Sequence, residues 1–168
     1  MRRHGNIRAM QTRWKPSVTV AAVIERDGRF LLVEEETSEG LRLNNPAGHL
    51  EPYESPQQAC AREVLEETAH EFRPTALVGV YLARFQRPSG DDVTYLRMTF
   101  CGQLGERDAL RRLDEGIVGT LWLTPQEVRA SAARHRSPLV LRCMEEYLAG
   151  VRHPLEVLHT DESVWRRP

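Results

Sequence analysis

Residues 48–67 read GHLEPYESPQQACAREVLEE and predict a well-capped helix with an acidic side. Ser55 suits the N-cap, Pro56 suits the first helical position, and Gln58 completes a capping box with Ser55. At about 100° per residue, apolar and small side chains gather on one side of this helix and glutamates on the opposite side. The first side comprises Ala61, Val64, Leu65 and Thr68, and the second comprises Glu63, Glu66 and Glu67.

The glutamates of this helix are spaced as neighbours. Glu63 lies three residues before Glu66 and four before Glu67, and like charges at these spacings destabilise a helix by roughly 0.2–0.5 kcal/mol per pair. A hard divalent cation such as Mg²⁺ would compensate, because it prefers carboxylate oxygens. Arg62, four residues before Glu66, could hold that carboxylate in one rotamer. The alternative is an ordinary solvated acidic face.

The wider spacing of this segment resembles the Nudix box. The pattern G-x5-E-x7-R-E-U-x-E-E, with U a bulky aliphatic residue, is formed by Gly48, Glu54, Arg62, Glu63, Val64, Glu66 and Glu67. The resemblance implies a Nudix hydrolase, in which metal ions assist the attack of water on a diphosphate. It makes Mg²⁺ the expected metal, with Mn²⁺ as a substitute. The implied metal ligands are Gly48, through its carbonyl, with Glu63, Glu66 and Glu67. Glu54 and Arg62 would support catalysis.

The end of the box departs from the family pattern. The family closes with a glycine and a bulky aliphatic residue, whereas this chain has Ala69 and His70. Glycine suits the left-handed conformation that ends many helices, and Ala69 would be strained there by roughly 1 kcal/mol. We therefore expect either that the helix continues for one residue or that His70 takes the turn.

Further motifs are similar to those of the NudJ-type phosphatases over about residues 15–158. They are Lys15-Pro16 before the strand at 18–24, the runs at 45–51 and 136–140, Trp122, and His153-Pro154-Leu155-Glu156. The resemblance implies release of terminal phosphate from small molecules, namely thiamine diphosphate, its hydroxymethylpyrimidine diphosphate precursor, or nucleoside tri- and diphosphates. Leu43 stands where a Trp is expected, so a ring-stacking contact is either missing or supplied elsewhere.

Candidate substrate and base residues lie outside the box. Arg97 and Arg136 could bind phosphate through bidentate hydrogen bonds, although an arginine taken alone is more often a surface or structural residue. In this family the general base is a carboxylate in the box or on a later loop. Glu66 is the candidate in the box, and Asp114 and Glu115 lie on such a loop, with Glu115 the preferred one of the two. Gly116 occupies the position where an acid is expected, and a hydroxide held by the metal is a further alternative.

The remaining sequence predicts a mixed sheet with packed helices. Predicted strands cover 18–24, 30–33, 41–43, 77–85, 93–104 and 120–123, with turns at 27–28 and 87–92, a break at 44–48 and a polar connection at 105–115. Further helices open at Thr124-Pro125 and Ser137-Pro138. The expected fold is α+β, an α/β/α sandwich with the box helix on one side of the sheet and the C-terminal helices packed on it.

Composition sets the outer limits. The chain has 168 residues and a formal net charge of −1, which suits one globular domain and argues against a nucleic-acid binder. We expect a loose N-terminal arm at 1–14, one domain at 15–158 and a C-terminal tail at 159–168. The apolar runs are too short for a membrane span, and three scattered cysteines favour a reducing cytoplasm. A monomer and a homodimer both remain open.

Three other functions are compatible with these features. A pyrophosphatase of ADP-ribose or another nucleoside diphosphate derivative would use the same box. A domain that binds a nucleotide without turnover is the alternative from another class, as is RNA binding by the arginine-rich arm. The retained carboxylates count against a domain without catalysis, because their repulsion would then serve no purpose.

Overall fold

The computed structural model describes residues 13–86, 90 and 92–167. Its strands are β1 (Ser17–Val23), β2 (Glu25–Arg26), β3 (Arg29–Thr37), β4 (Gly40–Asn44), β5 (Ala47–His49), β6 (His70–Gln86), β7 (Asp92–Arg107) and β8 (Ile117–Leu123). Its α-helices are α1 (Pro56–Thr68), α2 (Pro125–Ala130) and α3 (Leu139–Leu148). Short 3₁₀ turns cover Ala132–Arg134, Leu155–Val157 and Glu162–Trp165.

The strands form two sheets. The first has the order β5-β1-β7-β6, and β1 runs parallel to β7. In the second, β3 pairs with β2, β4 and β8. One row across the first sheet aligns His49, Thr19, Arg97 and Tyr81, so these side chains share a face. The predicted turn at Asp27-Gly28 joins β2 to β3, and both residues have the positive φ that such a hairpin turn requires (52° and 75°).

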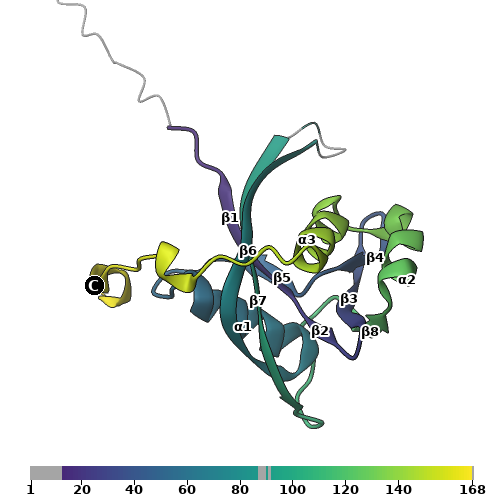
Figure 1. The fold of residues 1–168 in the computed structure, drawn as a ribbon. Coiled ribbons are helices and arrows are strands. Elements are labelled where there is room, and N and C mark those ends of the chain that lie inside the picture. The colour runs from purple at the N-terminus through teal and green to yellow at the C-terminus, as the bar shows by residue number, and fades with distance from the viewer. Residues whose placement is uncertain (1–12, 87–89, 91, 168) are drawn as a thin grey trace, which may run out of the picture.

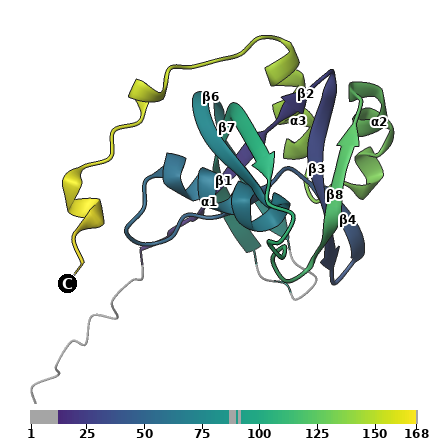
Figure 2. The same ribbon diagram turned by 90° about the horizontal axis from the view of Figure 1, so that it is seen from below.

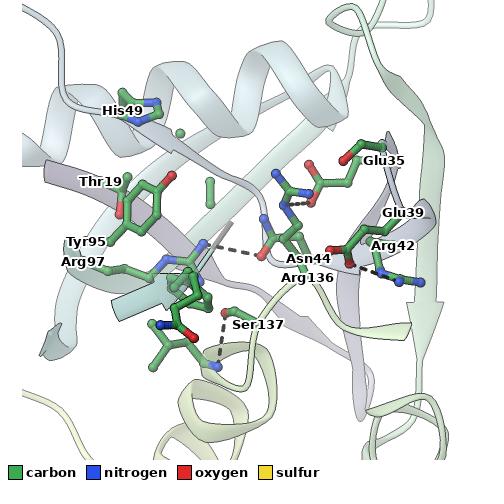
Figure 3. A pocket seen from close by; sticks show the side chains of 16 residues that line it. Thr19, Glu35, Glu39, Arg42, Asn44, His49, Tyr95, Arg97, Arg136 and Ser137 are labelled. Carbon is green, nitrogen blue, oxygen red and sulfur yellow. Dashed lines mark hydrogen bonds and ion pairs between the residues drawn. The ribbon is translucent and has the colours of Figure 1, made fainter. Parts of the chain in front are cut away.

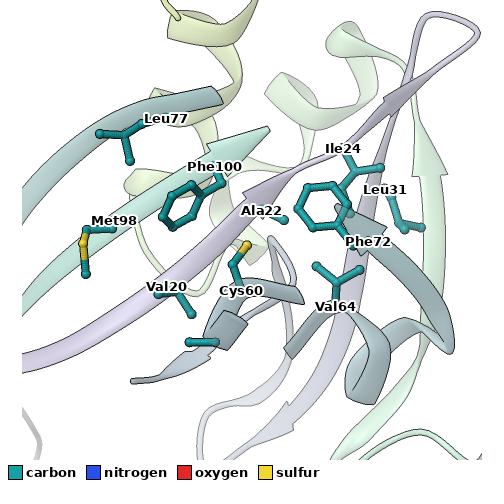
Figure 4. Close-up of a cluster of buried hydrophobic side chains, with 11 residues drawn as sticks. Val20, Ala22, Ile24, Leu31, Cys60, Val64, Phe72, Leu77, Met98 and Phe100 are labelled. Carbon is teal, nitrogen blue, oxygen red and sulfur yellow. The ribbon is translucent and has the colours of Figure 1, made fainter. Parts of the chain in front are cut away.

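Helices cover both faces of the first sheet (Figures 1 and 2). Side chains alternate along β1, so Val20 and Ala22 face α1 while Val23 faces α3. The α1 cluster also contains Ile24, Leu31, Ala59, Cys60, Val64, Phe72, Leu77, Met98 and Phe100 (Figure 4). The cluster on the other face joins Val23 to Phe30, Leu32, Leu43, Val128, Val140, Cys143 and Met144. The predicted α/β/α arrangement is confirmed.

Local capping signals are borne out closely. Ser55 accepts a hydrogen bond from the N–H of Gln58, and the Gln58 side chain accepts one from the N–H of Ser55. Thr124 and Glu127 form the same box at the start of α2. The expected strands are present, most of them longer than predicted, because pairing with a neighbour extends a strand beyond its apolar centre.

Two connections were predicted wrongly. The expected break at 44–48 contains the start of β5, which pairs with β1 despite its length of only three residues. The expected polar connection at 105–115 begins with the last residues of β7, because β6 continues alongside them. Both errors arise because pairing with a strand distant in sequence creates the structure. Most of the predicted arm at 1–14 and part of the turn at 87–92 lie outside the described residues.

The end of α1 also differs from both expectations. Ala69 itself adopts the left-handed conformation (φ 59°, ψ 21°), so neither an extra helical residue nor a turn at His70 is needed. Its N–H donates to the carbonyl of Leu65, and its carbonyl accepts from the N–H of Asp108. Ala69 is fully buried. Its packing and these two hydrogen bonds stabilise a left-handed conformation that glycine would adopt at little cost.

Among the described residues, no helix is long and apolar enough to cross a membrane.

Candidate active site

Strand β5 lies directly against the acidic side of α1. A Cβ on Gly48 would come within 2.1 Å of the Glu63 carboxyl carbon, so only glycine allows this approach. The N–H of Ala47 donates to Oε2 of Glu67 at 2.9 Å. Glu63 and Glu67 are therefore buried beside the apolar face of α1, which corrects the expectation of an acidic side opposite the core. Strand β5 buries these two carboxylates, so the spacing of residues along the helix alone cannot predict their burial.

Arg62 is the centre of a dense ion-pair network. It makes two hydrogen bonds with Glu54, at 3.0 and 2.8 Å, and Nη1 reaches Glu63 and Glu66 at 2.7 and 2.9 Å. Nη2 also donates to the carbonyl of His49 at 2.9 Å. The predicted contact between Arg62 and Glu66 is present, as one part of a larger network that joins β5, the following loop and α1.

The buried carboxylates favour a compensating cation. Burial raises the pKa of Glu67 to about 8; the Ala47 N–H opposes this, and the charges of Glu63, Glu35 and Asp114 add to it. Burial likewise raises the pKa of Glu63, against the opposing effect of Arg62 and with additions from Glu66 and Asp114. A hard divalent cation would relieve this repulsion, and the donor types (carboxylates with a backbone carbonyl) are those it prefers.

The carboxylates do not converge as they stand. Within residues 13–86, 90 and 92–167, no three His, Cys, Asp or Glu side chains lie close enough together to hold a metal ion. Instead, the Arg62 guanidinium lies between Glu63 and Glu66. Holding one ion with Glu63, Glu66 and Glu67 would require side chains to turn away from Arg62. The residue types fit the metal, and the expected ligand roles stay a prediction.

A cavity of about 920 Å³ lies on the other side of β5. Ala47 and Gly48 form part of its wall, so the strand that packs on Glu63 and Glu67 also faces the cavity. Both predicted substrate arginines line it (Figure 3). Arg97 is buried on the sheet, whereas Arg136 is half exposed and lies 3.5 Å from Glu35, measured from Nε to Oε1. The structure thus brings the arginines and the acidic helix to opposite sides of one short strand.

The loop before β8 approaches the acidic helix through Asp114. Its N–H donates to the Glu66 carbonyl at 3.0 Å, and its charge raises the pKa of both Glu63 and Glu67. Glu115 is exposed beside it, and Gly116 has a φ of 89°, which glycine adopts at little cost. No observation tests Glu115 as a base, which stays a prediction.

Sequence reasoning missed several residues of the cavity. Glu35 and Asn44 lie on β3 and β4, and Tyr95 on β7 packs its ring between His49 and Phe85, with centroid distances of 6.2 and 5.7 Å. Leu43, where a Trp was expected, is buried in the core and cannot stack on a ligand. The aromatic wall is thus supplied by other strands. Alternation along β7 places Tyr95 with Arg97, but no local signal indicates Glu35 or Asn44.

Known proteins share both the sequence and this fold. A family model described as "NUDIX domain" matches residues 13–143. Phosphatase NudJ of Escherichia coli (strain K12) is 35% identical over 145 residues, which cover 86% of this chain and 92% of NudJ. A NUDIX hydrolase from Nitrosomonas europaea is 53% identical with a TM-score of 0.81, over 88% of this chain and 98% of that one. A MutT protein from Methanosarcina mazei Go1, 22% identical with a TM-score of 0.62 over 81% and 96% of the two chains, shares the fold. The chain belongs to the Nudix hydrolase family.

Proposed function

We propose that this enzyme is a Mg²⁺-dependent phosphohydrolase that releases phosphate from thiamine-type diphosphates or from nucleoside tri- and diphosphates. One observation carries the proposal. Strand β5 packs Gly48 on Glu63 and hydrogen-bonds Ala47 to Glu67, and the same two residues form the cavity wall. When a substrate occupies the cavity, β5 is therefore the only described element between its phosphates and the carboxylates of α1.

The carboxylates of α1 would hold the metal together with the carbonyl of Gly48. When bound there, Mg²⁺ neutralises phosphate oxygens and makes water easier to deprotonate. Arg62 and Glu54 would keep Glu63 and Glu66 beside the metal position until an ion takes the place of the guanidinium, which now joins Glu54 to both. Among the ligands, we assign the water proton to the carboxylate of Glu66, whose side chain is 28% exposed against 11% for Glu63 and can pass the proton to solvent.

Other residues would bind the substrate, or would take the proton in place of Glu66. Arg136 stands at the cavity and is half exposed, so its guanidinium can meet a phosphate while losing only its 3.5 Å contact with Glu35. Arg97, the second candidate from the sequence, lies deeper in the cavity and would meet a part of the substrate other than its phosphates. Glu115 is the alternative base, and a Glu115→Gln variant with full activity would leave Glu66 as the acceptor of the proton.

The relatives support a phosphatase reaction. NudJ of Escherichia coli is named a phosphatase, and its similarity extends over 92% of its length.

The three described cysteines are free and buried, as suits a reducing cytoplasm. The cavity of about 920 Å³ is large enough for a nucleotide or a thiamine-type diphosphate, which supports a small-molecule substrate.

A panel of substrates tests the proposal. Thiamine diphosphate, nucleoside di- and triphosphates and ADP-ribose are incubated with Mg²⁺, with Mn²⁺ or with a chelator, and the products are separated. Orthophosphate formed only with metal supports the proposal. A nucleoside monophosphate from ADP-ribose, without orthophosphate from the others, indicates the pyrophosphatase instead. Tight nucleotide binding without any product indicates the sensing domain.

One substitution tests the site directly. Glu67→Gln should lower the rate of phosphate release by a factor of about 1000 or more. The variant loses a metal ligand, and a bound metal ion stabilises the transition state by several kcal/mol. Glu71→Gln is the matched control, since Glu71 is exposed and follows the helix. Full activity of a folded Glu67→Gln protein would refute the assignment.

A further inference from the structure

Arg97 is a buried guanidinium with few partners. The residue is only 8% exposed, yet its one hydrogen bond to a described side chain is a long contact of 3.4 Å from Nη2 to Oδ1 of Asn44. Its Nη1 is buried and makes no hydrogen bond within the described part of the chain. A buried donor without an acceptor costs about 1–3 kcal/mol, so this arrangement requires an explanation.

The carboxylate of Glu35, on strand β3, is an acceptor that lacks a donor. Oε1 of Glu35 is buried and makes no hydrogen bond to a described residue, although Nε of Arg136 lies 3.5 Å away. The Asn44 side chain lies close to Glu35, and its Oδ1 accepts from Arg97 (Figure 3). The three side chains thus form a row along the cavity, in which Asn44 stands between an unsatisfied acceptor and an unsatisfied donor (Figure 3).

This row suits a neutral group better than a phosphate. A phosphate bound to Arg97 would be repelled by the Glu35 carboxylate, whose charge already acts on Arg97. A group with both a donor and an acceptor satisfies both residues. The aromatic wall of His49, Tyr95 and Phe85 flanks the same cavity and offers rings on which a flat ligand can stack.

We propose that Glu35 and Arg97 determine specificity by binding the edge of a heteroaromatic ring that carries an amino group beside a ring nitrogen. The amino group donates to Glu35, and the ring nitrogen accepts from Arg97. Cytosine, adenine and the pyrimidine of thiamine all have this edge. The unsatisfied atoms lie below the cavity surface, so the side chains turn to meet the ring, and their present contacts of 3.4 and 3.5 Å are weak enough to allow it. The inference rests on the proposed function, since the ring belongs to the substrate whose phosphates reach α1.

Ligand pairs that differ only in the amino group provide the test. Calorimetry measures binding of α,β-methylene diphosphates of cytidine and of the same nucleoside without its 4-amino group, with Mg²⁺ present. Adenosine and purine riboside form the second pair. We expect the amino compound of at least one pair to bind five times more tightly or better, because its partner leaves a buried carboxylate oxygen unsatisfied.

Variants assign this preference to Glu35. Glu35→Met should bind both members of that pair within twofold, and Glu35→Gln, which keeps an acceptor, should restore part of the preference. Glu36→Met is the matched control on the exposed side of the same strand and should keep the wild-type ratio. A ratio below five in both pairs, binding of none of the four compounds, or a preference that survives Glu35→Met in a folded protein would overturn the inference. Failure of hydrolysis with this binding preference intact would count against the proposed function alone.

Discussion

Two arginines on either side of β5 are satisfied to very different degrees. Arg62, on the helix side, has a side chain that is 25% exposed, yet it hydrogen-bonds to Glu54, Glu63, Glu66 and the His49 carbonyl. Arg97, on the cavity side, is more deeply buried, but among the described residues it has one long hydrogen bond and no partner for Nη1. The difference indicates that Arg62 holds the protein's own carboxylates, whereas Arg97 is held ready for a ligand.

The largest expected effect concerns the acidic side of this comparison. In a chelator, the free energy of unfolding should fall by up to about 4 kcal/mol between pH 4.5 and 8. The Glu67 carboxyl keeps its proton to about pH 8 in the folded state, from an ordinary value of 4.5, so only the unfolded state releases a proton in this window. Stability conferred by the protonated group is complete below 4.5 and is lost as the pH rises through 8. Urea unfolding at a series of pH values measures the effect.

Two controls accompany this pH series. Glu67→Gln should flatten the profile, and excess Mg²⁺ should restore stability near pH 8, because a ligand of the folded state stabilises it by mass action. A flat profile of the wild-type protein in chelator would contradict the raised pKa of Glu67 and the cost of burying its charged form.

The next effect breaks the satisfied side directly. Arg62→Met should destabilise the protein by about 3 kcal/mol, because it leaves partly buried carboxylates without their shared partner. The carboxylates affected most are Glu54 and Glu63, whose side chains are 14% and 11% exposed. Urea unfolding at pH 7 checks this value. A loss below about 1 kcal/mol would mean that the network is replaceable by solvent, as exposed ion pairs are.

The two sides also differ in how far the sequence predicts them. Ser55, Pro56 and Gln58 specify the start of α1 locally, and the carboxylate spacing predicts the site, because both depend on residues within a few turns of one helix. The burial of Glu63 and Glu67 was not predictable, since it depends on the three-residue strand β5 pairing with β1.

The cavity side is less predictable still. Its row of polar side chains takes Glu35 from β3, Asn44 from β4 and Arg97 from β7. These residues meet only because two separate sheets pack together, and none of the three has a local pattern that points to the others. Arg97 was found as a single charged residue within an apolar strand, whereas the acceptor that complements it was not.

The third prediction acts on the unsatisfied side. Arg97→Met should change the free energy of unfolding by no more than about 1 kcal/mol, because replacing a poorly paired buried charge by an apolar side chain of similar size is close to neutral. Affinity for the amino-ring diphosphate should fall about tenfold, since the ring nitrogen loses its donor. Unfolding and calorimetry on the same preparation measure both. If Arg97→Met destabilised the protein as strongly as Arg62→Met, the contrast between the two arginines would be lost.

The smallest expected effect lies at the end of α1. Ala69→Gly removes a left-handed strain of about 1–2 kcal/mol. The same change destabilises the folded protein by about 0.4–1 kcal/mol through the greater entropy of the unfolded chain. It also deletes a buried methyl group that stabilises the fold by about 0.8 kcal/mol. Ala69 is fully buried with a φ of 59°, so these contributions should nearly cancel, within about 0.5 kcal/mol, and phosphate release should stay within twofold. Ala69→Val, which adds β-branching at the same φ, should destabilise clearly. A gain above about 1.5 kcal/mol from glycine would mean that the strain exceeds the packing, and that the cap of the acidic helix is held against a real cost.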